Sequence, residues 1–409
     1  MTLREAQALG DGRNAHRTGI SWRDALSLAI LGFVAALFAM KYGARTATAP
    51  AVAWTIGAMF AFVPAVMYLV ADRFVVRFLP SRRTFIAALV LAVLVVAVGV
   101  HVLPEASRVG RLPALREWLD AFLAGRFPYG TPAMPSGLPV LFLLALPFHL
   151  AGNLGWLEVI TVAAFGVVLL RLDPRDGAGW RPLAVLFVMP PFWYEVFVRS
   201  ELLFNMVLAL ALILLAEARL RADRIDGRFI LVAALFGLVL STRIVVALPW
   251  AAYAAYRFRR DILRGAAFAG LVLAAFALTL VPFFLWDPAA FLSRGPFAVQ
   301  GRYLPLPLAA AVLMTVTFLG WRATSLRDVV FAVGIILLAV VAPPFAAATA
   351  SSGFPDVLFA DGFDIGYFIL AVPWLVAGIG EERATGTRSL APGAAHSASA
   401  DGQGIMYTQ

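Results

Sequence analysis

The sequence predicts an all-α membrane protein that crosses the bilayer many times. Apolar residues make up 62% of the 409 residues and charged residues only 14%, whereas a soluble domain averages about half apolar and about a quarter charged. Several apolar stretches exceed the roughly 18 residues that indicate a transmembrane helix. The mean hydropathy of +0.86 agrees with this class.

Twelve apolar stretches are expected to be transmembrane helices: 25–40, 50–71, 85–103, 155–170, 182–198, 202–217, 229–242, 244–256, 265–285, 306–320, 329–347 and 365–379. The segment 138–150 is too short to cross and contains Pro139 and Pro147, so we expect an interfacial or re-entrant helix there. For 229–256 the sequence favours two short spans broken near Ser241-Thr242-Arg243. One long helix is the alternative.

The arginines predict the orientation of the spans. With the N-terminus in the cytoplasm, 23 of the 33 cations fall in inner segments, as expected for a bacterial-type cell (inner) membrane protein with both termini inside. Counting 138–150 as a full crossing removes this bias. The first 24 residues lack the apolar core of a cleavable signal peptide. The predicted organisation is a cytoplasmic N-terminal arm at 1–24, a transmembrane domain at 25–379 with external loops 104–137, 287–305 and 348–364, and a disordered cytoplasmic tail at 380–409.

Charge and composition exclude several classes of function. The net charge of +9 would suit a nucleic-acid partner, but the cations lie in short clusters between spans, as orientation signals do. Cysteine is absent, which excludes disulfides, thiolate metal sites and cysteine nucleophiles. The chain also has no P-loop, GxGxxG, HExxH or catalytic-serine motif.

The external loop 104–137 is the first place where chemistry is expected. It carries charged and aromatic residues beside the bilayer, where a protein that only spans lipid needs none. Glu117 and Asp120 are three residues apart and share one face of a helix. A carboxylate placed there can remove the proton of a poor nucleophile such as a sugar hydroxyl.

The motifs of this loop resemble a known family. Asp120…Gly125-x-x-Pro128-Tyr129, followed by Pro135-x-x-Leu-Pro139 and a short apolar segment, is similar to the first external loop of GT-C fold glycosyltransferases. The likeness is greatest to the polyprenyl-phosphate-sugar-dependent bacterial group that includes the glycosyltransferase 87 family. It extends over about residues 84–305. Three later stretches share it: Arg199-Ser-Glu201-Leu-Leu-Phe-Asn205, Leu240-Ser-Thr-Arg243-Ile…Leu248-Pro249 and Pro282-Phe-Phe-Leu-Trp286-Asp287-Pro288.

The resemblance implies an enzyme that moves a mannose-like sugar from a polyprenyl-phosphate donor to a glycan, lipid or protein acceptor at the outer face. The base would be Asp120, with Glu117 second. The substrate-binding candidates are Arg199, Arg243 and Arg302 for the leaving phosphate, Trp118 for stacking on the sugar, and Tyr129. The chain departs from the family at Arg111, where members carry an Asp, so either the base has moved or the usual chemistry is lost.

Structural interpretations stand beside these. Glu117 and Asp120 would also serve to solvate an amphipathic interfacial helix, and the arginines would serve as cations at helix ends. A structural ion pair with Glu195 and Glu201 is the alternative for Arg199.

No cofactor is required by any motif. Asp356, Asp361 and Asp364 are candidates for a divalent cation, with a plain acidic loop as the alternative. At the level of function, the rival is a transporter or lipid flippase, or a non-catalytic membrane scaffold of the same ancestry.

Overall fold

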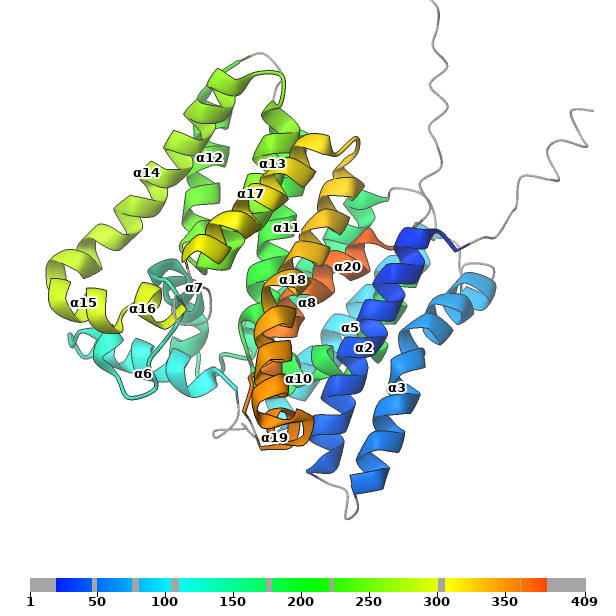
Figure 1. The fold of residues 1–409 in the computed structure, drawn as a ribbon. Coiled ribbons are helices and arrows are strands. Elements are labelled where there is room, and N and C mark those ends of the chain that lie inside the picture. Colours follow the sequence, from blue (N-terminus) through cyan, green and yellow to red (C-terminus); the bar gives the residue numbers. More distant parts are fainter. Residues whose placement is uncertain are drawn as a thin grey trace, which may run out of the picture.

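The computed structural model describes residues 20–45, 50–75, 81–103, 110–173, 179–220, 224–300, 306–360 and 362–380. These residues form helices and no strand, which confirms the all-α prediction for the part of the chain described (Figure 1). Residues 1–19 of the predicted N-terminal arm 1–24 and residues 381–409 of the predicted tail 380–409 lie outside it.

The first half of the fold contains α2 (Trp22–Ala44), α3 (Pro50–Val70), η1 (Ala71–Val75), α5 (Arg82–Val102), α6 (Leu112–Leu123), η2 (Pro128–Gly130), α7 (Pro139–Leu150), α8 (Trp156–Leu172), α9 (Trp180–Val188), α10 (Pro190–Val198) and α11 (Leu202–Arg219). The second half contains α12 (Gly227–Leu240), η3 (Ile244–Val246), α13 (Ala247–Phe258), α14 (Ile262–Trp286), α15 (Pro288–Arg294), α16 (Pro296–Gln300), α17 (Leu306–Arg322), α18 (Leu326–Ser352), α19 (Phe354–Phe359), η4 (Ile365–Ala371) and α20 (Val372–Gly378).

Six described helices are long and apolar enough to cross a membrane, namely most or all of α2, α3, α5, α11, α14 and α18. The outward faces of several helices are strongly apolar: Phe62 on α3 is 69% exposed, Leu91 on α5 63% and Leu278 on α14 71%. Water-soluble proteins rarely leave such extended apolar faces uncovered. These features agree with a membrane protein; the number of spans and the GT-C architecture remain predictions.

Proline shifts two of the expected boundaries. The stretch 182–198 forms two helices, α9 and α10, because Pro190 lacks a backbone N–H and cannot continue α9. The stretch expected at 365–379 starts as the 3₁₀ helix η4 and becomes α20 at Val372, just before Pro373. The expected loop 348–364 is largely helical, since α18 runs on to Ser352 and α19 follows.

The stretch 229–256 forms two helices, as favoured by the sequence. Between α12 and η3, Arg243 has an extended backbone with φ −162° and ψ 135°. The ring centroids of Phe229 in α12 and Phe258 in α13 lie 6.2 Å apart. This contact shows that the chain turns back after the break. The alternative of one long helix is therefore wrong.

Contacts sort the connections into two ends of the bundle. At one end, Arg327 pairs with Asp173 at 2.6 Å, and the backbone N–H of Gly380 donates to Asp24 at 3.0 Å. This arginine-rich end also joins Arg264 to the carbonyl of Arg224. The other end, called the site end below, holds the residues preceding α6 and α7, the start of α11, the break after α12, and α15, α16 and α19. Figure 1 shows α6, α7, α15 and α16 grouped beside the end of α14.

Candidate functional site

A buried ion pair marks the centre of the site end. Arg243 lies in the break after α12, and Glu201 is the residue before the first turn of α11. Arg243 Nη2 donates to Glu201 Oε1 at 2.8 Å and to Ser136 Oγ at 3.0 Å. The two charged side chains are only 2% and 4% exposed. Burying an unpaired arginine here would be energetically unfavourable, and the carboxylate of Glu201 stabilises the charge of Arg243 in this apolar setting.

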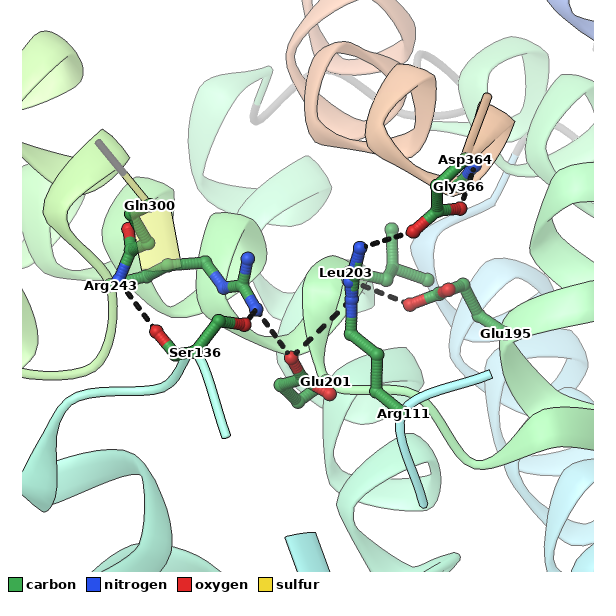
Figure 2. Close-up of polar contacts among 9 residues, drawn as sticks. All are labelled: Arg111, Ser136, Glu195, Glu201, Leu203, Arg243, Gln300, Asp364 and Gly366. Carbon is green, nitrogen blue, oxygen red and sulfur yellow. Dashed lines mark hydrogen bonds and ion pairs between the residues drawn. The ribbon is translucent and has the colours of Figure 1, made fainter. Parts of the chain in front are cut away.

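A second arginine extends this pair into a network. Arg111, just before α6, lies with its Nε 3.8 Å from Glu201 Oε1 and its Nη2 2.6 Å from Asp364 Oδ2. Its guanidinium lies over the Tyr367 ring, 4.5 Å from the ring centroid. Burial acts to lower the pKa of Arg111, but the carboxylate of Asp364, with Tyr367 and Glu201, outweighs it and raises the pKa. Arg111 is therefore a permanent cation. Arg111, Glu201, Arg243 and Asp364 are called the ion network below (Figure 2).

Loops from distant parts of the chain close around Arg243. The Nε2 of Gln300, at the end of α16, donates to the carbonyl of Ser136 at 2.6 Å. The entry to α7 is pinned to the break after α12, because the N–H of Leu138 donates to the carbonyl of Thr242. Two predicted external loops and the break at Arg243 thus converge on one place, as Figure 2 shows for Ser136, Arg243 and Gln300.

The arginines of the network retain donor capacity. Within the described residues, the Nε atoms of Arg111 and Arg243 have no hydrogen-bond partner. A guanidinium offers five N–H donors in a planar fork that matches phosphate oxygens. Both Nε atoms are buried, so an anionic headgroup would reach them only if the surrounding loops moved apart.

The two predicted base candidates lie along α6, beyond Arg111. Asp120 is exposed, with a 61% exposed side chain, and its Oδ1 lies 2.9 Å from His149 Nε2. Glu117 is half-buried, and its Oε2 accepts the N–H of Ala133 at 3.0 Å. Glu117 is thereby tied to the same loop that brings Ser136 to Arg243. Asp120 is tied to α7, and its catalytic role remains a prediction.

The structure gives Trp118 and Tyr129 packing roles. Trp118 is 0% exposed, and its ring stacks on Phe142 with centroids 4.2 Å apart and on Phe122 at 5.2 Å. Contrary to expectation, it presents no free ring face to a sugar. Tyr129 is also 0% exposed and donates to the carbonyl of Gly137 at 3.2 Å. Burial raises the pKa of its phenol well above the usual value. Both rings belong to the aromatic core that fixes α6 onto α7 and α14.

Of the two remaining predicted phosphate ligands, the structure describes Arg199 alone. Arg199 has a left-handed backbone with φ 51°. Its Nη2 donates to the carbonyls of Val100 at 2.8 Å and Leu103 at 3.3 Å, at the end of α5. Glu201, expected as its ion-pair partner, instead contacts Arg243 and Arg111. Arg302 lies outside the described residues.

The divalent-cation prediction gains no support from the described acidic loop. Asp364 is engaged with Arg111 and with the N–H of Gly366, while Asp361 lies outside the described residues. In the described part of the chain, no three acidic or histidine side chains have the mutual spacing of a metal site.

Sequence reasoning missed the roles of Glu201, Arg111 and Asp364. Arg111 and Asp364 are 253 residues apart, and only the fold brings them together. A signal for Glu201 existed, since it is a carboxylate at the start of an otherwise apolar span and requires a partner. Its partner could not be identified from spacing.

Comparison with known proteins gives no relative for this arrangement. No protein-family model, no curated protein and no solved structure matches the chain.

Proposed function

We propose that the chain is a membrane glycosyltransferase that moves a sugar from a polyprenyl-phosphate donor to an acceptor at the outer face of a bacterial-type inner membrane. The observation that carries the proposal is the convergence at the site end of two buried guanidiniums with three loops. A transferase of this kind needs an anion site beside a carboxylate, both open to a lipid-borne substrate.

The architecture proposed with this function has twelve spans and a GT-C-like core. With twelve crossings, the described parts of the expected inner loops would lie at the arginine-rich end and those of the expected outer loops at the site end. Contacts such as Arg327–Asp173 at one end and Arg111–Asp364 at the other support this sorting. The positive-inside rule then puts the site end outside and both termini in the cytoplasm.

In the proposed reaction, the acceptor hydroxyl oxygen forms a bond to the anomeric carbon of the sugar. The bond between that carbon and the phosphate oxygen breaks, and its electron pair leaves with the polyprenyl phosphate. The hydroxyl proton passes to a carboxylate. Arg243 and Arg111 stabilise the charge that develops on the leaving phosphate.

Geometry favours Glu117 over Asp120 as the base. Along a helix rising about 1.5 Å per residue, Glu117 lies about 9 Å from Arg111 and Asp120 about 13.5 Å from it. Glu117 is also joined through Ala133 to the loop of Ser136. Asp120 retains the alternative of acting with His149, which lies within hydrogen-bonding distance.

The test is transfer of a labelled sugar from polyprenyl-phosphate mannose to candidate acceptors by the purified protein in lipid nanodiscs. Glu117→Gln is expected to lower turnover by about 100-fold or more, the usual effect of losing a general base. Asp356→Asn is the matched control, because Asp356 is an exposed carboxylate at the same end. Full activity of both Glu117→Gln and Asp120→Asn would remove the base assignment. Absence of transfer by folded wild-type protein with every donor and acceptor would reject the enzyme.

The second candidate function is a transporter or lipid flippase. Fully buried carboxylates on α8 and α10 favour it, since ionisable groups inside a membrane bundle commonly line ion or substrate pathways. Counterflow of a labelled substrate across proteoliposomes, without chemical change, would support this class instead.

A further inference from the structure

An open apolar groove runs along the outward face of α17. It has a volume of about 440 Å³ and is lined by Leu313, Met314, Thr317, Phe318 and Trp321. Residues at this spacing share one face of a helix. Met314 is 67% exposed, and Phe318 and Trp321 are each 53% exposed. The hydroxyl of Thr317 donates to the carbonyl of Leu313 at 2.6 Å, so its donor is used within the helix. In a membrane protein, such a groove meets acyl chains.

The groove reaches the arginine-rich end of the bundle. Trp321 and Arg322 close the last turn of α17, and α18 begins at Leu326 shortly after it. Tryptophan rings are enriched at the headgroup level of a membrane. From Leu313 to Trp321 a helix rises about 12 Å. The groove therefore extends from the headgroup level toward the middle of the bilayer.

Two arginines lie at this end of the groove. Arg322 follows Phe318 by one helical turn and so lies on the groove face. Arg260 follows the end of α13, where Arg259 Nη1 donates to the carbonyl of Ala323 at 2.5 Å. That contact joins the neighbours of Arg260 and Arg322 in the sequence, so the ends of α13 and α17 bring both arginines to one place. Both are exposed.

The charge of these two arginines is not compensated. Each carboxylate of the flanking segments has another partner: Glu217 pairs with Arg257, Asp328 pairs with Arg23, and Asp261 accepts the N–H of Arg264. Among the described residues, neither Arg260 nor Arg322 forms an ion pair. The groove therefore ends in a positive patch beside the headgroup level.

We propose that this end of α17 is a binding site for one anionic phospholipid. An acyl chain lies in the groove, and Arg322 and Arg260 bind the phosphate of the headgroup. The planar donors of a guanidinium match phosphate oxygens, and basic pockets between transmembrane helices bind anionic headgroups. Charge selects the occupant, because the groove alone accepts any acyl chain, whereas two arginines without carboxylates favour an anionic headgroup over a zwitterionic one.

The lipid site lies at the opposite end of the bundle from the ion network and does not depend on the proposed transfer reaction. It has a structural consequence for α17, whose buried residues are Val316 and Gly320. Gly320 faces the carbonyl of Ala252 on α13. A phospholipid held on the outward face is expected to stabilise the packing of α17 against α13.

The experiment is native mass spectrometry of the full chain from mixed micelles that contain equal amounts of phosphatidylglycerol and phosphatidylcholine with the same acyl chains. Wild-type protein is expected to retain one phosphatidylglycerol, with a preference over phosphatidylcholine of at least about tenfold. The double variant Arg260→Gln, Arg322→Gln is expected to weaken this retention by about 25-fold, because each arginine beside an anionic headgroup contributes about a factor of five. The matched control is Arg82→Gln, Arg83→Gln, which removes two exposed arginines from the start of α5 at the same end. It is expected to retain the lipid as the wild type does.

Two further measurements test the acyl chain. Thr317→Trp places a large ring in the groove and leaves the arginines unchanged, so it is expected to lower retention of phosphatidylglycerol at an unchanged melting temperature. Glycerol phosphate carries the charge without a chain and is expected not to compete. Effective competition by glycerol phosphate, or full retention by Thr317→Trp, would exclude the groove as part of the site.

The charge comparison can overturn the proposal by itself. Equal retention of the two phospholipids by the wild type would reject an anionic lipid site. Equal losses in the two double variants would assign the preference to the overall surface charge and would also reject it. None of these outcomes bears on the transfer assay.

Discussion

Replacing Arg243 with methionine is the sharpest test of the ion network. The substitution removes the guanidinium that contacts Glu201 at 2.8 Å and Ser136 at 3.0 Å. It leaves Glu201 buried, with Arg111 at 3.8 Å as its remaining cation. Breaking one partner of a buried pair costs about 3–5 kcal/mol. Because Arg111 still compensates part of the charge, we expect about 3 kcal/mol of lost unfolding free energy.

A double-mutant cycle separates the pair from simple packing loss. Glu201→Gln is expected to cost a similar amount, because it leaves Arg243 without its carboxylate. The double variant is expected to cost less than the sum of the singles by about 2 kcal/mol, since neither charge is then left alone. Unfolding free energies come from denaturing-detergent titration in mixed micelles, followed by the fluorescence of the ten tryptophans.

Arg126→Met is the control for loss of an arginine at the same end, because Arg126 is exposed. It is expected to change stability by no more than about 0.5 kcal/mol. Equal effects of Arg126→Met and Arg243→Met, or strict additivity in the cycle, would refute the reasoning.

Three further predictions concern packing at named positions. Trp118→Ala should cost about 3–5 kcal/mol of unfolding free energy, as for a large core aromatic; a loss of sugar affinity at unchanged stability would contradict its packing role. Gly320→Ala should destabilise the protein by about 1–3 kcal/mol, because the added Cβ would lie 2.2 Å from the carbonyl oxygen of Ala252. Gly270→Ala is the control and should not destabilise the protein, since a Cβ there meets open space. Burial raises the pKa of Tyr129, so the folded form keeps its phenol neutral while the unfolded chain ionises above pH about 10. The stability that Tyr129 contributes is thus complete below that pH and is lost as pH rises further. Tyr129→Phe should therefore reduce the fall in melting temperature at alkaline pH. An equal fall in the wild type and the variant would contradict this prediction.

Hydropathy predicted the helices well because an apolar helix is a local property of the sequence. It also gave the short helix at 138–150 and the break near Arg243, since Pro139 and the Ser241-Thr242-Arg243 run interrupt apolar segments directly. It did not separate α9 from α10. The residues around Pro190 are as apolar as their neighbours, and only the missing N–H of proline divides them.

The partners of charged residues were beyond local reasoning. Spacing placed Glu201 beside Arg199, two residues earlier. The left-handed backbone of Arg199 accompanies a side chain that reaches the carbonyls of Val100 and Leu103. Glu201 is then available to Arg243, which is 42 residues away along the chain. A periodic pattern gives the face on which a charge lies, but the partner depends on which helices pack together.

Arg111 shows why a departure from a motif has to be judged in three dimensions. Taken alone, an arginine where the resembling family carries an Asp argues against catalysis. In the fold, that arginine meets a carboxylate from the far end of the chain, Asp364, and extends the network that holds Glu201 and Arg243. Arg111 thus serves as an anchor between the start of α6 and η4. The proposed transferase would then need a base from elsewhere on α6, and Glu117, tied to the loop of Ser136, is the carboxylate that we propose for it.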